Sequence, residues 1–211
     1  ESADPVDFAI PDPLGPKDVP ARASGAFTFR PSLVLIGDGT VFGQNAASLD
    51  QSGRQRDRAE IRAARLSFLG SIGTGYRVRY QISAEYRGFD SRTDTNWQLT
   101  DLSLTFPLGT RTTLQLGKTK ETFAYEMVGD AANLPAAERV LSPFFVTRNT
   151  GARLIHVWGP DKRGTLSLGL YNDAWDIQAP SRRGIDASAR VTALLWADPT
   201  DESRYLHLGA A

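Results

Sequence analysis

Segments in which apolar and polar residues alternate follow one another along most of this chain. In the clearest segment, from Tyr76 to Arg87, the alternation continues for twelve residues without a break. Because successive side chains of a β-strand point to opposite faces, this segment predicts a strand with one apolar face and one charged face. The apolar face begins with Tyr76 and ends with Tyr86. Tyrosines at both ends of a band of about ten residues are typical of a strand that crosses a membrane.

Weaker segments of the same kind predict further strands. They cover residues 27–36, 61–69, 100–106, 111–117, 151–158, 165–171 and 187–195, and another strand begins at 205–211. Segment 151–158 is ambiguous, because either of its faces contains an awkward residue, Arg153 or His156. The prevalence of period-two patterning predicts an all-β chain.

The connections between these strands alternate in length. Long or medium connections at 37–60, 88–96, 118–150 and 172–186 alternate with short ones at 70–75, 107–110, 159–164 and 197–204. Short periplasmic turns and longer external loops are the asymmetry of outer-membrane barrels. The pattern therefore predicts a transmembrane, antiparallel, up-and-down β-barrel. Loop 118–150 is the longest. If the N-terminus is periplasmic, it is the third external loop, and we expect it to narrow the lumen.

Two regions can be distinguished along the chain. Residues 1–25 are rich in proline and lack periodicity, which predicts an irregular N-terminal segment. Residues 26–211 carry the barrel strands. Because the last residues, 205–211, read as an unfinished strand, and an unpaired strand edge in lipid is costly, we expect the barrel to continue beyond them.

Composition narrows the class of protein. The 24 basic and 24 acidic residues give a formal net charge of zero, which argues against a nucleic-acid partner. The absence of cysteine excludes disulfides, thiolate metal sites and a cysteine nucleophile. Mean hydropathy is −0.30, a low value that a membrane barrel shares because its lipid-facing and lumen-facing residues alternate. The chain starts without a charged-then-apolar leader, as expected if a secretion signal has already been removed.

No catalytic constellation is recognisable. His156 and His207 are the only histidines, and neither has an acid or nucleophile at a familiar spacing. A serine-type triad, an HExxH zinc motif and a phosphate-binding glycine loop are missing, and the glycine-rich run 70–75 joins two predicted strands. We therefore expect no enzyme, no metal site and no cofactor.

Arginines gather on the polar faces of the predicted strands. Of the basic residues, twenty are arginines and only four are lysines. The candidate pore-lining residues are Arg65, Arg77, Arg79, Arg87, Arg111, Arg153 and Arg190, and the loop candidates for a constriction are Lys118, Lys120, Arg139 and Arg148. Fixed positive charges along a water-filled lumen favour anions. Glu85 and Asp101 lie on the same faces and would neutralise part of this charge.

Several short segments carry a resemblance to a known family. They are Arg65–Gly70, Tyr76–Tyr86, Leu116–Phe123, Glu138–Arg139, Arg148–Gly151 and Leu206–Ala210. Together they resemble the phosphate-selective porin O and P group of outer-membrane proteins. One departure is Thr122, where the family often has a proline before the phenylalanine, and the family's aromatic and arginine residues at the eyelet have no clear match here.

The resemblance implies a sixteen-stranded porin, of which this chain would supply the first eight or nine strands, assembled as a homotrimer in the lipid of a bacterial outer membrane. We expect passive diffusion of small, phosphate-like anions or small polar solutes through an arginine-lined pore. One alternative is a structural barrel bound to other envelope proteins. Another is a soluble β-barrel binding domain.

Overall fold

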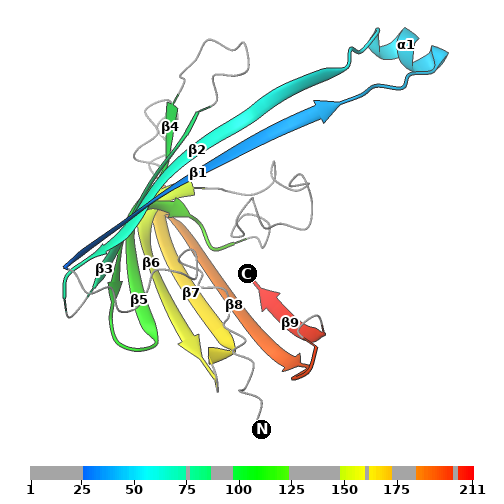
Figure 1. The fold of residues 1–211 in the computed structure, drawn as a ribbon. Helices are drawn as coiled ribbons and strands as arrows, with labels where there is room; N and C mark the ends of the chain where they lie inside the picture. Colours follow the sequence, from blue (N-terminus) through cyan, green and yellow to red (C-terminus); the bar gives the residue numbers. More distant parts are fainter. Residues whose placement is uncertain are drawn as a thin grey trace.

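The structure is a computed structural model that describes residues 26–74, 77–86, 97–123, 148–159, 162–172, 184–201 and 204–211. These residues form one sheet of nine strands and one short helix (Figure 1). The elements are β1 (Phe27–Thr40), α1 (Ala46–Ser52), β2 (Arg58–Ile72), β3 (Val78–Tyr86), β4 (Trp97–Pro107), β5 (Thr112–Lys120), β6 (Arg148–Trp158), β7 (Gly164–Asn172), β8 (Asp186–Ala197) and β9 (Tyr205–Ala210).

Each strand pairs antiparallel with the next strand in the chain, so the order in the sheet is the order in the sequence. The predicted all-β, up-and-down architecture is confirmed. The sheet is open within the described residues, where β1 and β9 form its two edges. No helix in the part of the chain that the structure describes is long and apolar enough to cross a lipid bilayer.

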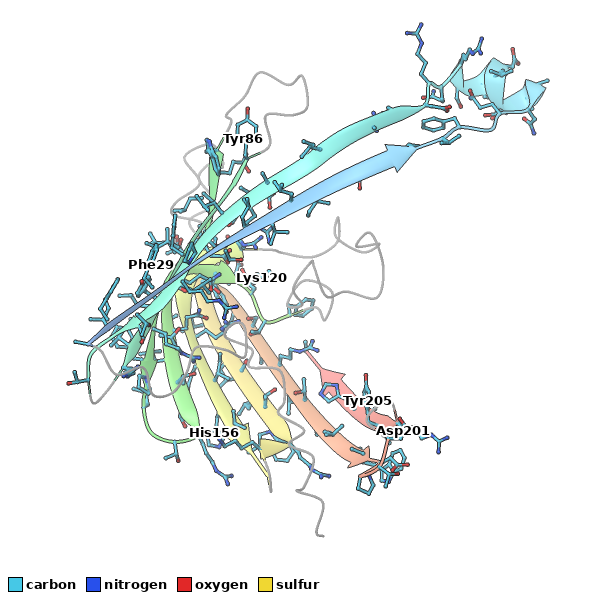
Figure 2. The ribbon with its side chains drawn as sticks, in the orientation of Figure 1. Phe29, Tyr86, Lys120, His156, Asp201 and Tyr205 are labelled. Atoms are coloured by element: carbon cyan, nitrogen blue, oxygen red, sulfur yellow. The ribbon has the colours of Figure 1, made fainter. Side chains whose placement is uncertain are left out.

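The predicted alternation of connection lengths is also present. Residues 73–77, 108–111, 159–163 and 198–204 make the short connections, and residues 41–57, 87–96, 121–147 and 173–185 make the long ones. In Figure 2, His156 and Asp201 lie toward one end of the sheet and Tyr86 toward the other. The first of these is the short-turn end and the second is the long-loop end.

Several strands differ from the expected bounds. β1 continues to Thr40 and β2 begins at Arg58, so the first long connection is shorter than the sequence suggested. β5 does not stop at Gly117 but continues to Lys120. Gly117 has φ +124°, and an added Cβ would lie 2.1 Å from the carbonyl oxygen of Leu102. Glycine therefore lets β5 pass this position while remaining paired with β4 and β6.

The register places apolar side chains of neighbouring strands on one face, which we call the apolar face. Phe68 of β2 is opposite Ile82 of β3, and Ile82 is opposite Leu102 of β4. The rings of Phe29 and Phe68 stack with centroids 5.5 Å apart. Such cross-strand pairs fix the register, because a shift by one residue would move every side chain to the other face.

Burial is inverted relative to a water-soluble sheet. Among the described residues, three apolar side chains are buried, against fourteen that are polar or charged. Large apolar side chains are instead exposed along the apolar face, for example Ile82 at 41%, Leu104 at 43% and Leu168 at 45%. An exposed apolar surface of this kind is typical of a face that contacts lipid or another protein. The opposite face, which we call the polar face, is the buried one, so the sheet curls around polar side chains.

Aromatic side chains mark the ends of the apolar face. Tyr86 and Trp97 are register partners near the long-loop end, with ring centroids 5.4 Å apart. Phe106 lies near the short-turn end of the same strand β4. At about 3.3 Å per residue, Trp97 and Phe106 are about 30 Å apart along the strand. With the usual tilt of about 35–45°, this spans about 21–25 Å, which matches the apolar band of an outer-membrane barrel.

Three glycines lie directly opposite an aromatic residue on the adjacent strand. The pairs are Gly70 with Tyr80, Trp158 with Gly164, and Gly151 with Tyr171. A Cβ at Gly164 would lie 2.3 Å from Trp158 Cε2, and a Cβ at Gly70 would lie 2.5 Å from the Tyr80 hydroxyl. Each ring therefore lies across the bare backbone of its glycine, an arrangement that helps to pin the register.

The β1–β2 hairpin extends past the end of β3. Pairing of β2 with β3 ends at Ala64 and Tyr86, whereas β1 and β2 stay paired as far as Thr40 and Arg58. The hairpin therefore projects from the sheet and carries α1 at its tip (Figure 1).

Local hydrogen bonds hold this tip. The Ser48 backbone amide donates to Asn45 Oδ1 over 2.9 Å and caps the N-terminus of α1. The Phe42 backbone amide donates to Asp57 Oδ1 over 2.9 Å and joins the two strands at the base of the tip. The tip is thus a self-contained structure at the long-loop end.

Candidate functional site

The polar face holds the candidate site. Its side chains come mainly from alternate positions of β2 to β8 and include Ser83, Glu85, Asp101, Gln115 and Arg153, each at most 7% exposed. Because lipid-facing residues occupy the other positions, these polar groups are the ones that water or solute would meet in a membrane barrel. The arrangement of charge on this face therefore decides what it can bind or pass.

Two arginines are neutralised by carboxylates of the polar face. Arg65 on β2 donates from Nε to Glu85 Oε2 on β3 over 3.1 Å, and its NH2 group contacts the same oxygen. Arg148, the first residue of β6, donates from Nε to Asp101 Oδ1 on β4 over 3.1 Å. All four side chains are 20% exposed or less. Both carboxylates that the sequence placed on this face are thus engaged with arginines.

Arg153 is held differently. Its side chain reaches from β6 to Gln115 Oε1 on β5, and its NH1 group donates to the Lys120 carbonyl over 3.2 Å. Gln115 Nε2 in turn donates to Ser103 Oγ on β4 over 3.0 Å. This row of bonds across β4, β5 and β6 ends in a guanidinium whose acceptors are an amide and a backbone carbonyl. Within the described residues, its hydrogen-bond acceptors are therefore dipoles, and the Asp101 carboxylate acts on its charge only through space.

The Tyr171 ring fixes the surroundings of Arg153. Arg153 is directly opposite Gly169 on β7, and a Cβ at Gly169 would lie 2.3 Å from Tyr171 Cε2. The ring therefore lies over Gly169 beside the arginine, and it is 1% exposed. The sequence carries no signal for this role of Tyr171, because only the pairing of β6 with β7 brings its ring beside Arg153.

Segment 151–158 is no longer ambiguous. Arg153 faces the polar side, and His156 lies on the apolar side, where its Nδ1 is 2.9 Å from Thr112 Oγ1. Ile155, 2% exposed, is on the same face as Arg153. The strand tolerates this mixture because each awkward side chain has a hydrogen-bond partner on the neighbouring strand.

The other described arginines are distributed along the face. Arg79 is opposite Ser71 and Thr105, both buried polar residues, and Arg77 precedes β3 on the same alternation. Arg190 is opposite Ser167 and donates from NH1 to the Phe123 carbonyl over 2.8 Å. These positions agree with the predicted polar face.

Arg111 occupies a different position from the one expected. It precedes β5, is exposed, and donates from NH1 to the Gly159 carbonyl over 3.2 Å. Since Gly159 belongs to the short connection between β6 and β7, Arg111 links two turns at the short-turn end and does not lie midway along the wall.

Lys118 and Lys120 lie in a strand and not in the loop to which the sequence assigned them, and Arg148 is likewise a strand residue, the first of β6. Their role in a constriction stays a prediction. Both lysines belong to β5, and Lys118 is opposite Leu102 and Thr150. Thr119, between them, is buried on the polar face, so alternation places Lys118 on the face of Leu116. A lysine near the end of a membrane strand can keep its ammonium at the water interface. Arg87 and Arg139 lie outside the described residues.

Glu121 is a site residue that the sequence did not reveal. It follows β5, is 4% exposed and accepts a hydrogen bond of 2.6 Å from Asn149 Nδ2. Burial raises the pKa of the Glu121 carboxyl above its usual range, although the bond from Asn149 opposes this effect. Only the pairing of β5 with β6 brings these two residues together. Within the described ranges, no three histidine or acidic side chains gather in a way that could hold a metal ion.

Comparison with protein families decides the classification. The model of the phosphate-selective porin O and P family matches residues 42–211, which is more than half of the chain. The chain belongs to this family. A comparison with curated proteins gave no match. The porin O and P family consists of outer-membrane channel proteins and is not an enzyme family.

Proposed function

We propose that the chain forms part of an outer-membrane porin through which small anions, including phosphate-like oxyanions, or other small polar solutes diffuse passively. Membership of the porin O and P family supports the assignment as a channel and a location in the lipid of the outer membrane. The observation that carries the anion preference is the state of Arg153, a buried cation whose acceptors are neutral.

The physical basis is electrostatic. A neutral acceptor orients a guanidinium but leaves its full charge to act on the lumen. An ion pair of opposite charges, by contrast, has only a weak field at a distance. Two unit charges about 10 Å apart in water interact by about 0.4 kcal/mol, or about a twofold change in local ion concentration, and more in a confined lumen. Arg153, with contributions from Arg79 and Arg190, would therefore enrich anions.

The remaining parts of the proposal rest on the family. We propose a homotrimer of sixteen-stranded barrels, in which the long connection between β5 and β6 narrows the lumen. Arg139 would act in that connection, and Arg148 would act at its base through Asp101. Arg65, Arg77, Arg79, Arg87, Arg153 and Arg190 would line the pore, with Arg111 at its short-turn rim.

Reversal potentials across planar bilayers in a KCl gradient test the proposal with the full-length protein. We expect a chloride-to-potassium permeability ratio above one, and a ratio lowered by about twofold in Arg153→Gln. Arg204→Gln is the matched control, because Arg204 pairs with Asp201 in an exposed short turn and should leave the ratio unchanged. A cation-selective wild-type channel, or a closed barrel that co-purifies with another envelope protein, would overturn the proposed function.

A further inference from the structure

Two carboxylates of the polar face lie close together on neighbouring strands. Asp101 on β4 is opposite Ser83 on β3, and Glu85 is two residues further along β3 on the same face. Glu85 is 5% exposed and Asp101 is 7% exposed. Each accepts a hydrogen bond from an arginine of a different strand, Arg65 and Arg148 respectively, with one donor–acceptor distance of 3.1 Å in each pair. The four residues form a belt of charge across β2, β3, β4 and β6.

We infer that Glu85 and Asp101 are specificity-determining residues that hold the anion preference of the pore below the level its arginines would otherwise give. The inference rests on the proposed function of an anion-preferring pore. Removing either negative charge would expose the field of its arginine to the lumen and increase the preference for anions.

The geometry separates charge from shape in this case. A glutamine at position 85 has nearly the same shape as glutamate, and its amide oxygen can still accept the bonds from Arg65. The same holds for asparagine at position 101 and the bond from Arg148. Each amide therefore keeps the arginine in place but changes the charge of the pair from zero to one. Truncation would confuse the two effects, because it would release the arginine.

The number of paired charges on this face makes the expected change measurable. Arg65 and Arg148 are neutralised by carboxylates, whereas Arg153 and Arg190 on the described polar face donate to neutral acceptors. Removing one of the two paired negative charges therefore leaves one further guanidinium without a neutralising carboxylate. A unit charge about 4–10 Å from a passing ion in water changes the local ion concentration by about twofold to fivefold.

The test measures reversal potentials in a KCl gradient for the full-length protein and for Glu85→Gln and Asp101→Asn. We expect either variant to raise the chloride-to-potassium permeability ratio by about twofold to fivefold at about 0.1 M salt, where the Debye length is about 10 Å. At about 1 M salt, where it is about 3 Å, the increase should largely disappear. A change of pore shape would alter conductance at both salt concentrations.

The double variant with Glu85→Gln and Arg65→Gln is the matched control. It has no net charge at these two positions, as in the wild type, so its chloride-to-potassium permeability ratio should return to the wild-type value. Folding of every variant is checked by the heat-dependent shift of gel mobility. A wild-type channel that prefers anions, together with a ratio unchanged or lowered in both Glu85→Gln and Asp101→Asn, overturns this inference alone. A wild-type channel without anion preference instead defeats the proposed function.

Discussion

A single charge placed on the apolar face gives the sharpest test of which solvent covers it. Leu168 is the central residue of β7, four residues from each end of the strand. It is opposite Leu154 and Ala189 on the two neighbouring strands and is 45% exposed. Four residues correspond to about 13 Å of strand, or about 10 Å along the membrane normal at the usual tilt. Leu168 would therefore lie near the middle of the bilayer.

The expected cost of Leu168→Arg follows from this depth. An arginine on the lipid face of an outer-membrane barrel costs about 2–4 kcal/mol at the midplane and about 0–1 kcal/mol near the interfaces. If water covered the same face, an exposed leucine replaced by arginine would change the free energy of unfolding by no more than about 0.5 kcal/mol. The two environments thus differ by several times the error of a careful measurement.

The assay is equilibrium unfolding in denaturant with phospholipid vesicles present, followed by tryptophan fluorescence and extrapolated linearly to zero denaturant. Leu108→Arg is the control, because Leu108 is exposed in the short turn between β4 and β5; its cost should not exceed about 1 kcal/mol. If Leu168→Arg proved as mild as Leu108→Arg, the apolar face would not be in contact with lipid, and the membrane placement of the whole sheet would be refuted.

Three further predictions concern stability. Burial raises the pKa of Glu121, so the folded protein keeps a proton on this carboxyl at pH values where the unfolded chain has released it. The contribution of Glu121 to stability is therefore present in acid and lost as pH rises. The free energy of unfolding of Glu121→Gln, measured relative to the wild type, should increase from acid to neutral pH. Gly169→Val should displace the Tyr171 ring, cost about 1–3 kcal/mol and alter near-ultraviolet circular dichroism, whereas Gly43→Ala, with open space around it, should not alter that signal. Replacing residues 43–55 by a two-residue turn should leave gel mobility shifts and conductance intact, because the tip is held by its own bonds; loss of folding would show that the tip supports the sheet.

Strand positions could be predicted because alternation is a local signal. The segment around Tyr80 shows its two faces within a few residues, and its neighbours in the sheet only confirm them. The end of β5 could not be read in this way. A glycine at position 117 usually weakens a strand, but here its positive φ lets the strand continue to Lys120. The pattern of apolar and polar residues cannot predict this continuation of β5, because the continuation depends on the pairing of Gly117 with Gly151.

The charge of the wall was harder still to predict, because it depends on contacts between residues far apart in the chain. Arg65 and Glu85 are twenty residues apart, and Asp101 and Arg148 are forty-seven apart. The charges of these residues and the face shared by Glu85 and Asp101 could be predicted from the sequence. The arginine that each carboxylate binds could not. Once the register is known, Arg148 belongs to a neutral pair with Asp101, whereas Arg153 donates to neutral acceptors. The selectivity of such a wall is therefore a property of its hydrogen-bond network, and two chains with the same residues on the same face but a different register would select different ions.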